Sequence, residues 1–136
     1  MKKLLNTAFS YVIAGALGGV FFREFTKFSG FTGKTALSYL HPHLIGLGSL
    51  VFLLLALFAG MKDFTGDKKF GHFYLVYNAG LIGMCAMFLV RGILDVRGGE
   101  LSSMVNASVS GIAGLFHICM LAGLYRMMSL LKRSFS

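Results

Sequence analysis

Apolar stretches without charge alternate with short polar segments along the whole chain. Four uncharged windows are bracketed by charged residues, namely Lys3 and Arg23, Lys34 and Lys62, Lys69 and Arg91, and Glu100 and Arg126. Each window approaches or exceeds the roughly 20 residues that a helix needs to cross the hydrocarbon core of a bilayer. Backbone groups in lipid must bond within their own segment, so each window predicts a helix.

This pattern predicts an all-α, polytopic membrane protein, an antiparallel four-transmembrane-helix bundle forming a single domain over residues 1–136. We expect the helices near residues 4–23, 36–60, 70–95 and 104–131. The short connections make consecutive helices antiparallel neighbours. A secretory signal peptide is the alternative for the first window, because Lys2 and Lys3 precede it and Ala14-Gly15-Ala16 resembles a cleavage site. A retained helix is favoured, because the apolar run continues to Phe22.

Composition and charge agree with a membrane protein. Charged residues make up 13% of the chain, against about a quarter in soluble domains. The net charge of +8 comes from Lys and Arg at the ends of the windows, which argues against nucleic acid as a partner. Eight of the 13 Lys and Arg residues lie on the side of the two termini, which leaves five on the other. This excess predicts a multi-pass membrane protein with both termini cytoplasmic.

Small residues recur at four-residue spacing in the first and fourth windows. The pairs are Ala14 with Gly18, Gly15 with Gly19, Ala107 with Gly111, and Ser110 with Gly114. Such pairs let helix backbones approach closely in lipid. We expect them to pack inside the bundle. The alternatives are that they clear space for a flat cofactor or for a second subunit of a homo-oligomer.

Four histidines are the strongest indication of chemistry, because ionisable groups inside a membrane are costly and commonly functional. His41 and His43 flank Pro42 in the outer part of the second helix, and on a regular helix they point about 200° apart. Pro42 lies either in the first helical turn or inside a helix that starts near Ala36 and kinks there. His117 lies about half-way along the fourth helix, beside small residues.

Three ionisable groups on the third helix also matter for a site. His72, at its cytoplasmic start, is expected to be an interfacial histidine. Arg91 interrupts the apolar run near the outer end, and Asp95 follows four residues later on the same face. Arg91 also lies at the depth of the second-helix histidines, where an arginine could receive a carboxylate or another anion.

Three interpretations of the histidines remain open. A haem between the helices would use neutral imidazole as an axial ligand, and helix bundles commonly hold such cofactors. A bare copper or zinc ion would also accept His41, His43 and His117. Alternatively, the histidines only bond to neighbouring helices. No nucleophile–base pair or paired carboxylate is visible in the sequence, so hydrolysis is not predicted, and redox activity would require a bound cofactor.

Several segments carry a resemblance to a known family. They are residues 1–9, 22–28, 30–35 and 110–114, together with His117. They resemble a family of small, four-helix bacterial membrane proteins of unassigned function. This resemblance implies that the chain lies in the bacterial cytoplasmic (inner) membrane. In addition, Leu40-His41-Pro42-His43-Leu44, continuing to Gly48, resembles the second helix of haem-copper oxidases and nitric oxide reductases. This resemblance implies that His41 ligates haem. The later helices of those enzymes have no counterpart here, so it does not imply reduction of oxygen or nitric oxide.

We therefore expect a haem-binding, b-type cytochrome-like membrane protein that transfers electrons or binds haem or a gas ligand. His41 and His117 would be the axial ligands of haem b, with His43 as the alternative and Arg91 beside a propionate. The expected partners are the lipid bilayer and, beyond it, a quinone or respiratory-chain proteins. The alternative functions are a small oligomeric transporter or channel module and an accessory subunit of a respiratory complex. We expect the polar site in the outer half of helices two to four, with helix one contributing mainly packing.

Overall fold

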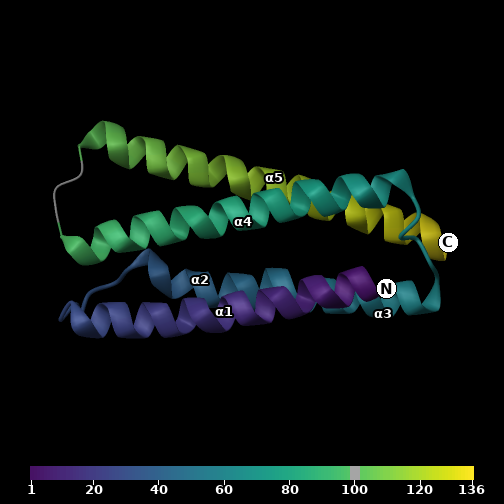
Figure 1. Ribbon diagram of the computed structural model, residues 1–136. Coiled ribbons are helices and arrows are strands. Elements are labelled where there is room, and N and C mark those ends of the chain that lie inside the picture. The colour runs from purple at the N-terminus through teal and green to yellow at the C-terminus, as the bar shows by residue number, and fades with distance from the viewer. Residues whose placement is uncertain (99–101) are drawn as a thin grey trace.

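The computed structural model describes residues 1–98 and 102–136, which form four long helices (Figure 1). These are α1 (Lys2–Phe28), a second span (Ala36–Met61), α4 (Lys68–Arg97) and α5 (Ser103–Phe135). Their most apolar windows have mean hydropathies from 1.5 to 2.5, and the described residues contain no strand. The predicted ranges agree with the helices to within five residues at every boundary, so the four-helix prediction is confirmed. Glu100, which bounds the fourth window, lies outside the described residues.

The helices associate as two antiparallel hairpins. The second span packs along α1, and α5 packs along α4. Because α4 also contacts the second span, it lies between α5 and the first hairpin (Figure 1). Both chain termini lie at one end of the bundle, which we call the terminal end. The connection 29–35 and the last turn of α4 lie at the opposite end, which we call the distal end.

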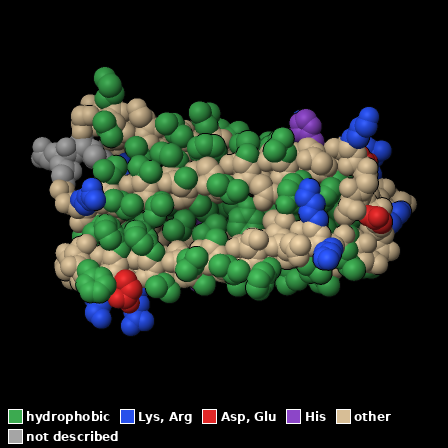
Figure 2. Space-filling view, in the orientation of Figure 1, with side chains coloured by type: hydrophobic (Ala, Val, Ile, Leu, Met, Phe, Trp, Pro, Cys, Tyr) green, Lys and Arg blue, Asp and Glu red, His purple; other side chains and the backbone are tan. Residues whose placement is uncertain are grey.

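The surface between these ends is apolar. Figure 2 shows hydrophobic side chains over the middle of the molecule and Lys and Arg side chains gathered towards its ends. Leu17, Leu57 and Leu115 are each more than 60% exposed. A continuous apolar surface of this kind suits contact with lipid rather than water. The chain is therefore an integral membrane protein.

The second span changes helical type along its length. It begins with a 3₁₀ segment (Ala36–Tyr39), continues through α2 (Leu40–His43) and a π-helical segment (Leu44–Leu50), and ends with α3 (Val51–Met61). Pro42 therefore lies inside a helix that starts at Ala36, which excludes the first-turn placement. Proline removes one helical hydrogen bond, and the change of type occurs around it. π-helical segments are frequent at functional sites, which directs attention to this part of the span.

The core lies where α4 meets the first hairpin. Its fully buried side chains include Leu4, Phe52, Phe73, Tyr77, Leu81 and Met84. The Tyr77 hydroxyl donates a hydrogen bond to the Leu47 carbonyl oxygen over 2.7 Å. Leu47 belongs to the π-helical segment, so a core tyrosine satisfies one of the carbonyls there.

Glycines on α1 allow the first hairpin to pack closely, as the spacing predicts. A Cβ atom at Gly15 would lie 2.7 Å from Cδ1 of Ile45 in the second span. The corresponding prediction for α5 is wrong, because a Cβ atom at Gly111 or Gly114 would meet nothing within 4 Å. These two glycines point away from the rest of the chain.

Other glycines make the close contact between α4 and α5. A Cβ atom at Gly80 would lie 2.5 Å from the backbone nitrogen of Met120, and one at Gly123 would lie 2.9 Å from the backbone nitrogen of Tyr77. The two helix backbones therefore meet directly along this stretch. This contact fixes the position of α5 relative to α4.

Candidate functional site

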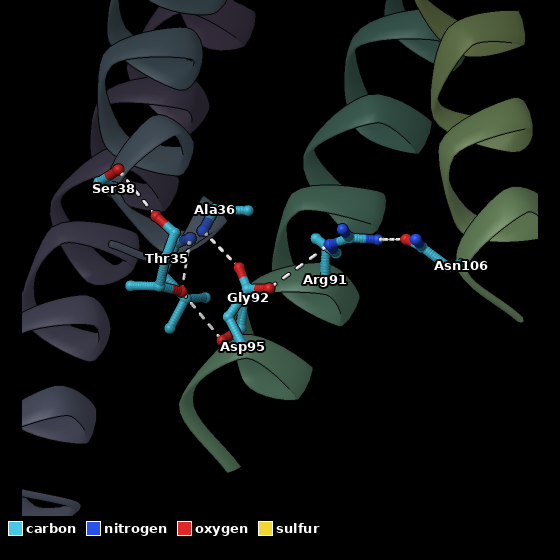
Figure 3. Close-up of polar contacts among 8 residues, drawn as sticks. Thr35, Ala36, Ser38, Arg91, Gly92, Asp95 and Asn106 are labelled. Atoms are coloured by element: carbon cyan, nitrogen blue, oxygen red, sulfur yellow. Dashed lines mark hydrogen bonds and ion pairs between the residues drawn. The ribbon is translucent and has the colours of Figure 1, made fainter. Parts of the chain in front are cut away.

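Backbone and side-chain hydrogen bonds fix the start of the second span against α4 at the distal end (Figure 3). Thr35 caps the span by accepting a hydrogen bond from the Leu37 N–H, and its hydroxyl donates to the Gly92 carbonyl oxygen over 2.9 Å. The Ala36 N–H donates to Oδ2 of Asp95 over 2.9 Å. A Cβ atom at Gly92 would lie 2.5 Å from the Leu37 nitrogen, so this approach requires glycine.

Arg91 connects the same region to α5. Its Nε atom lies 3.4 Å from Oδ1 of Asp95, which confirms the pairing predicted from their four-residue spacing. Its Nη1 atom donates to Oδ1 of Asn106 near the start of α5 (Figure 3). A guanidinium carries five N–H donors, so these contacts leave donors for a further acceptor.

A cavity of about 460 Å³ opens beside this network. Lys34, Tyr39, Arg91 and Asp95 are among its lining residues. Two cations and one carboxylate give these ionisable groups a net charge of one positive unit. A cavity with an excess of one sign of charge attracts the opposite sign, so it suits an anionic group.

Four aromatic rings extend from this cavity into the membrane-spanning part. The ring of Tyr39, which lines the cavity, lies 5.7 Å from that of Phe88 on α4, measured between centroids. The His43 imidazole lies 4.9 Å from the Phe88 ring, and the His117 imidazole lies 6.0 Å from it. Phe88 therefore contacts imidazoles from two different helices, the second span and α5.

Hydrogen bonds indicate the tautomer that each imidazole adopts when neutral. Nδ1 of His43 lies 2.8 Å from the Tyr39 carbonyl oxygen, and Nδ1 of His117 lies 3.0 Å from the Ala113 carbonyl oxygen. A carbonyl oxygen only accepts, so each neutral ring carries its proton on Nδ1 and keeps a lone pair on Nε2. Metal-bound histidines usually have this arrangement, in which the second nitrogen donates to a carbonyl.

His41 lies on the other side of the second span. Its Nδ1 atom is 2.9 Å from the Gly15 carbonyl oxygen of α1, and a Cβ atom at Gly19 would lie 3.3 Å from it. His43, rather than His41, therefore contacts the Phe88 ring, which His117 also contacts. The divergence agrees with the expected angle between residues two apart on a helix. α1 also does more than pack, because it supplies the acceptor for His41.

The remaining candidate residues lie elsewhere. His72 lies at the terminal end, in the first two turns of α4. Within residues 1–98 and 102–136, no group of three or more His, Cys, Asp or Glu side chains is arranged to hold a metal ion. Sequence analysis missed Phe88 and Asn106. Phe88 is one of many apolar residues in its helix, and its only distinguishing feature is a position one turn before Arg91.

The chain belongs to the family described as "Protein of unknown function (DUF2871)", whose model matches residues 1–134. This match confirms the predicted membership of a family without an assigned function. No curated protein and no solved structure matches the chain. The resemblance of the second helix to haem-copper oxidases stays a prediction.

Proposed function

We propose that this member of the DUF2871 family binds haem in the membrane, with His43 and His117 as its axial ligands. One observation carries the proposal, namely that imidazoles from two helices contact the same phenylalanine ring, and each keeps a lone pair on Nε2. Haem needs only one or two protein ligands, because the porphyrin supplies the other iron ligands. Two imidazoles therefore suffice for haem, whereas structural zinc sites usually have four protein ligands.

The choice of His43 over His41 rests on the direction of each ring. His43 contacts Phe88 on the α4 side of the span, where α5 also lies, while His41 bonds to α1. Phe88 and Tyr39 place apolar aromatic surface around the imidazole. The apolar surroundings of a metal centre limit access of solvent and tune its redox potential.

The cations of the distal cavity support the same proposal. Arg91 follows Phe88 by three residues on α4, about 4.5 Å further along the helix axis towards the distal end. Arg91 and Lys34 line one cavity with Tyr39, whose ring contacts both Phe88 and His43. These two cations would hold the propionates of the haem. Arginine suits this role because its planar fork binds carboxylates through paired hydrogen bonds.

We also propose that both termini face the cytoplasm of a bacterial cell. The distal end and its cavity would then lie in the outer half of the cytoplasmic membrane. A haem there exchanges electrons with a quinone or a respiratory-chain protein, or binds a gas ligand. A copper or zinc ion at the same two histidines is the alternative cofactor.

A second candidate function has one observation in its favour. Gly111 and Gly114 on α5 face away from the chain, and small residues on a transmembrane helix favour contact with another helix. The protein would then act as an oligomeric transporter or channel module, or as an accessory subunit of a respiratory complex. Cross-linking in native membranes tests this proposal. Loss of an oligomer in Gly111→Leu supports it, and a monomer in both proteins contradicts it.

Absorption spectra of the full-length protein, purified from haem-replete cells, test haem binding. We expect a Soret band in the wild type that is lost or strongly reduced in His43→Ala and in His117→Ala. His72→Ala is the matched control, because His72 lies at the other end of α4, and it should keep the band. Absence of the band from the wild type would refute haem binding, and elemental analysis would then test for copper or zinc. Loss of the band in His41→Ala but not in His43→Ala would restore His41 as the ligand.

A further inference from the structure

A cleft of about 420 Å³ lies at the terminal end, between the start of α4 and the end of α5. Its lining residues are Lys68, Lys69, His72, Tyr125, Arg126, Ser129, Leu130 and Arg133. The cleft is separate from the histidine site, which lies towards the distal end. Half of its lining residues are Lys or Arg.

Helical spacing explains why these residues converge. Arg126, Ser129 and Arg133 follow one another at intervals of three and four residues, so they share one face of α5. Lys68 and His72 are four residues apart on the first turns of α4 and face the same cleft. The antiparallel packing of the two helices brings these two faces together.

The basic side chains of the cleft form no ion pairs within it. It contains four Lys and Arg side chains and no carboxylate, and within the described residues none of the four forms an ion pair. Asp67 is adjacent in sequence, but its Oδ1 atom accepts the Lys69 backbone N–H over 2.8 Å and caps α4. The amino terminus of α4 adds a partial positive charge and the carboxyl end of α5 a partial negative one, so the four side chains set the sign of the cleft. An anion in the cleft would relieve the repulsion between these groups.

We propose that this cleft binds the phosphate group of an anionic ligand. Arginine and lysine side chains donate charge-assisted hydrogen bonds to phosphate oxygens. Basic pockets between transmembrane helices on the cytoplasmic side bind lipid headgroups in this way. The same chemistry would serve the headgroup of an anionic phospholipid, with its chains on the apolar surface of α4 and α5, or a free phosphate.

Native mass spectrometry of the full-length protein in neutral detergent tests this assignment, with phosphatidylglycerol and phosphatidylcholine as probes. We expect the wild type to prefer phosphatidylglycerol, and Arg126→Gln/Arg133→Gln to bind it about 25-fold more weakly, at about five-fold per cation lost near an anionic surface. Lys2→Gln/Lys62→Gln is the matched control. It removes the same charge from the same end, but outside the cleft, and should change binding less than two-fold.

The source of the phosphate group is distinguished by competition. Displacement of phosphatidylglycerol by millimolar inorganic phosphate supports a free-phosphate site, whereas resistance to it supports a lipid headgroup site. Equal binding of the two lipids by the wild type, or equal losses in the two double variants, would overturn the proposal. If the arginine variant does not fold, Lys68→Gln gives the same test with an expected five-fold loss.

Discussion

The glycine contact between α4 and α5 permits the sharpest test of the architecture. In Gly80→Ala, the new Cβ atom would lie 2.5 Å from the nitrogen and 2.7 Å from Cα of Met120. Ordinary van der Waals contacts of Cβ atoms begin at 3.4 Å, so the helices must separate by up to 3.4 − 2.5 = 0.9 Å at this point. Rotation of a side chain cannot relieve the clash, because the atoms of Met120 belong to the backbone.

The cost follows from two opposing effects. Overpacking of a tightly packed interface costs about 1–3 kcal/mol. Alanine is a better helix former than glycine by up to about 1 kcal/mol, which offsets part of this loss. We expect a net destabilisation of about 1–2 kcal/mol in Gly80→Ala. Gly111→Ala is the control on α5, where the added methyl group meets nothing within 4 Å, and it should be neutral or slightly stabilising.

Unfolding by SDS in mixed micelles, followed by far-UV circular dichroism, measures this difference. The chain has no tryptophan, so helix content is the suitable probe. Equal stability of Gly80→Ala and Gly111→Ala would refute the packing of α5 on α4 described above.

The same pair of variants also tests the proposed haem site. His117 lies three residues before Met120 on α5, so separation of the helices should lower haem occupancy in Gly80→Ala but not in Gly111→Ala.

Three further predictions concern hydrogen bonds elsewhere in the chain. Thr35→Val removes a helix cap and a bond to α4, and should lower the free energy of unfolding by about 1–2 kcal/mol in the same SDS assay. Tyr77→Phe leaves the part-buried Leu47 carbonyl without this donor and should cost about 1–3 kcal/mol, whereas an unchanged unfolding curve would contradict this contact. Hydrogen bonds from the Thr65 hydroxyl and N–H lower the pKa of Asp63, which lies in the connection before α4. The charged carboxylate therefore stabilises the folded state at pH values above its unfolded pKa. This stabilisation is lost as the pH falls through the lower pKa of the folded state. Carbon-13 NMR titration should show this pKa rising towards its ordinary value in Thr65→Val.

Windows of uncharged residues predict the four spans because a bilayer tolerates few charges in its apolar core. This rule depends on sequence alone and locates each helix boundary to within five residues. The pairing of Arg91 with Asp95 follows in the same way from their spacing on one helix. These features are local, so a single sequence suffices to predict them.

The features that sequence could not predict depend on how the helices meet. The spacing of His41 and His43 predicts only that the two rings diverge, whereas the packing of the second span between α1 and α4 determines which ring faces which helix. The spacing of small residues on α5 predicted packing at Gly111, yet the backbones of the two helices meet at Gly80 of α4 and at Gly123 of α5. Both outcomes are set by tertiary packing, which local spacing does not contain.

We propose that His43 and His117 hold one haem between them. Electron paramagnetic resonance of the oxidised, full-length protein, purified from haem-replete cells, detects such a haem through its iron. We expect low-spin ferric haem with two axial imidazoles, and loss of that signal in His43→Ala and His117→Ala but not in His72→Ala. Absence of any haem signal from the wild type, or a low-spin signal that survives both of the first two substitutions, would contradict it.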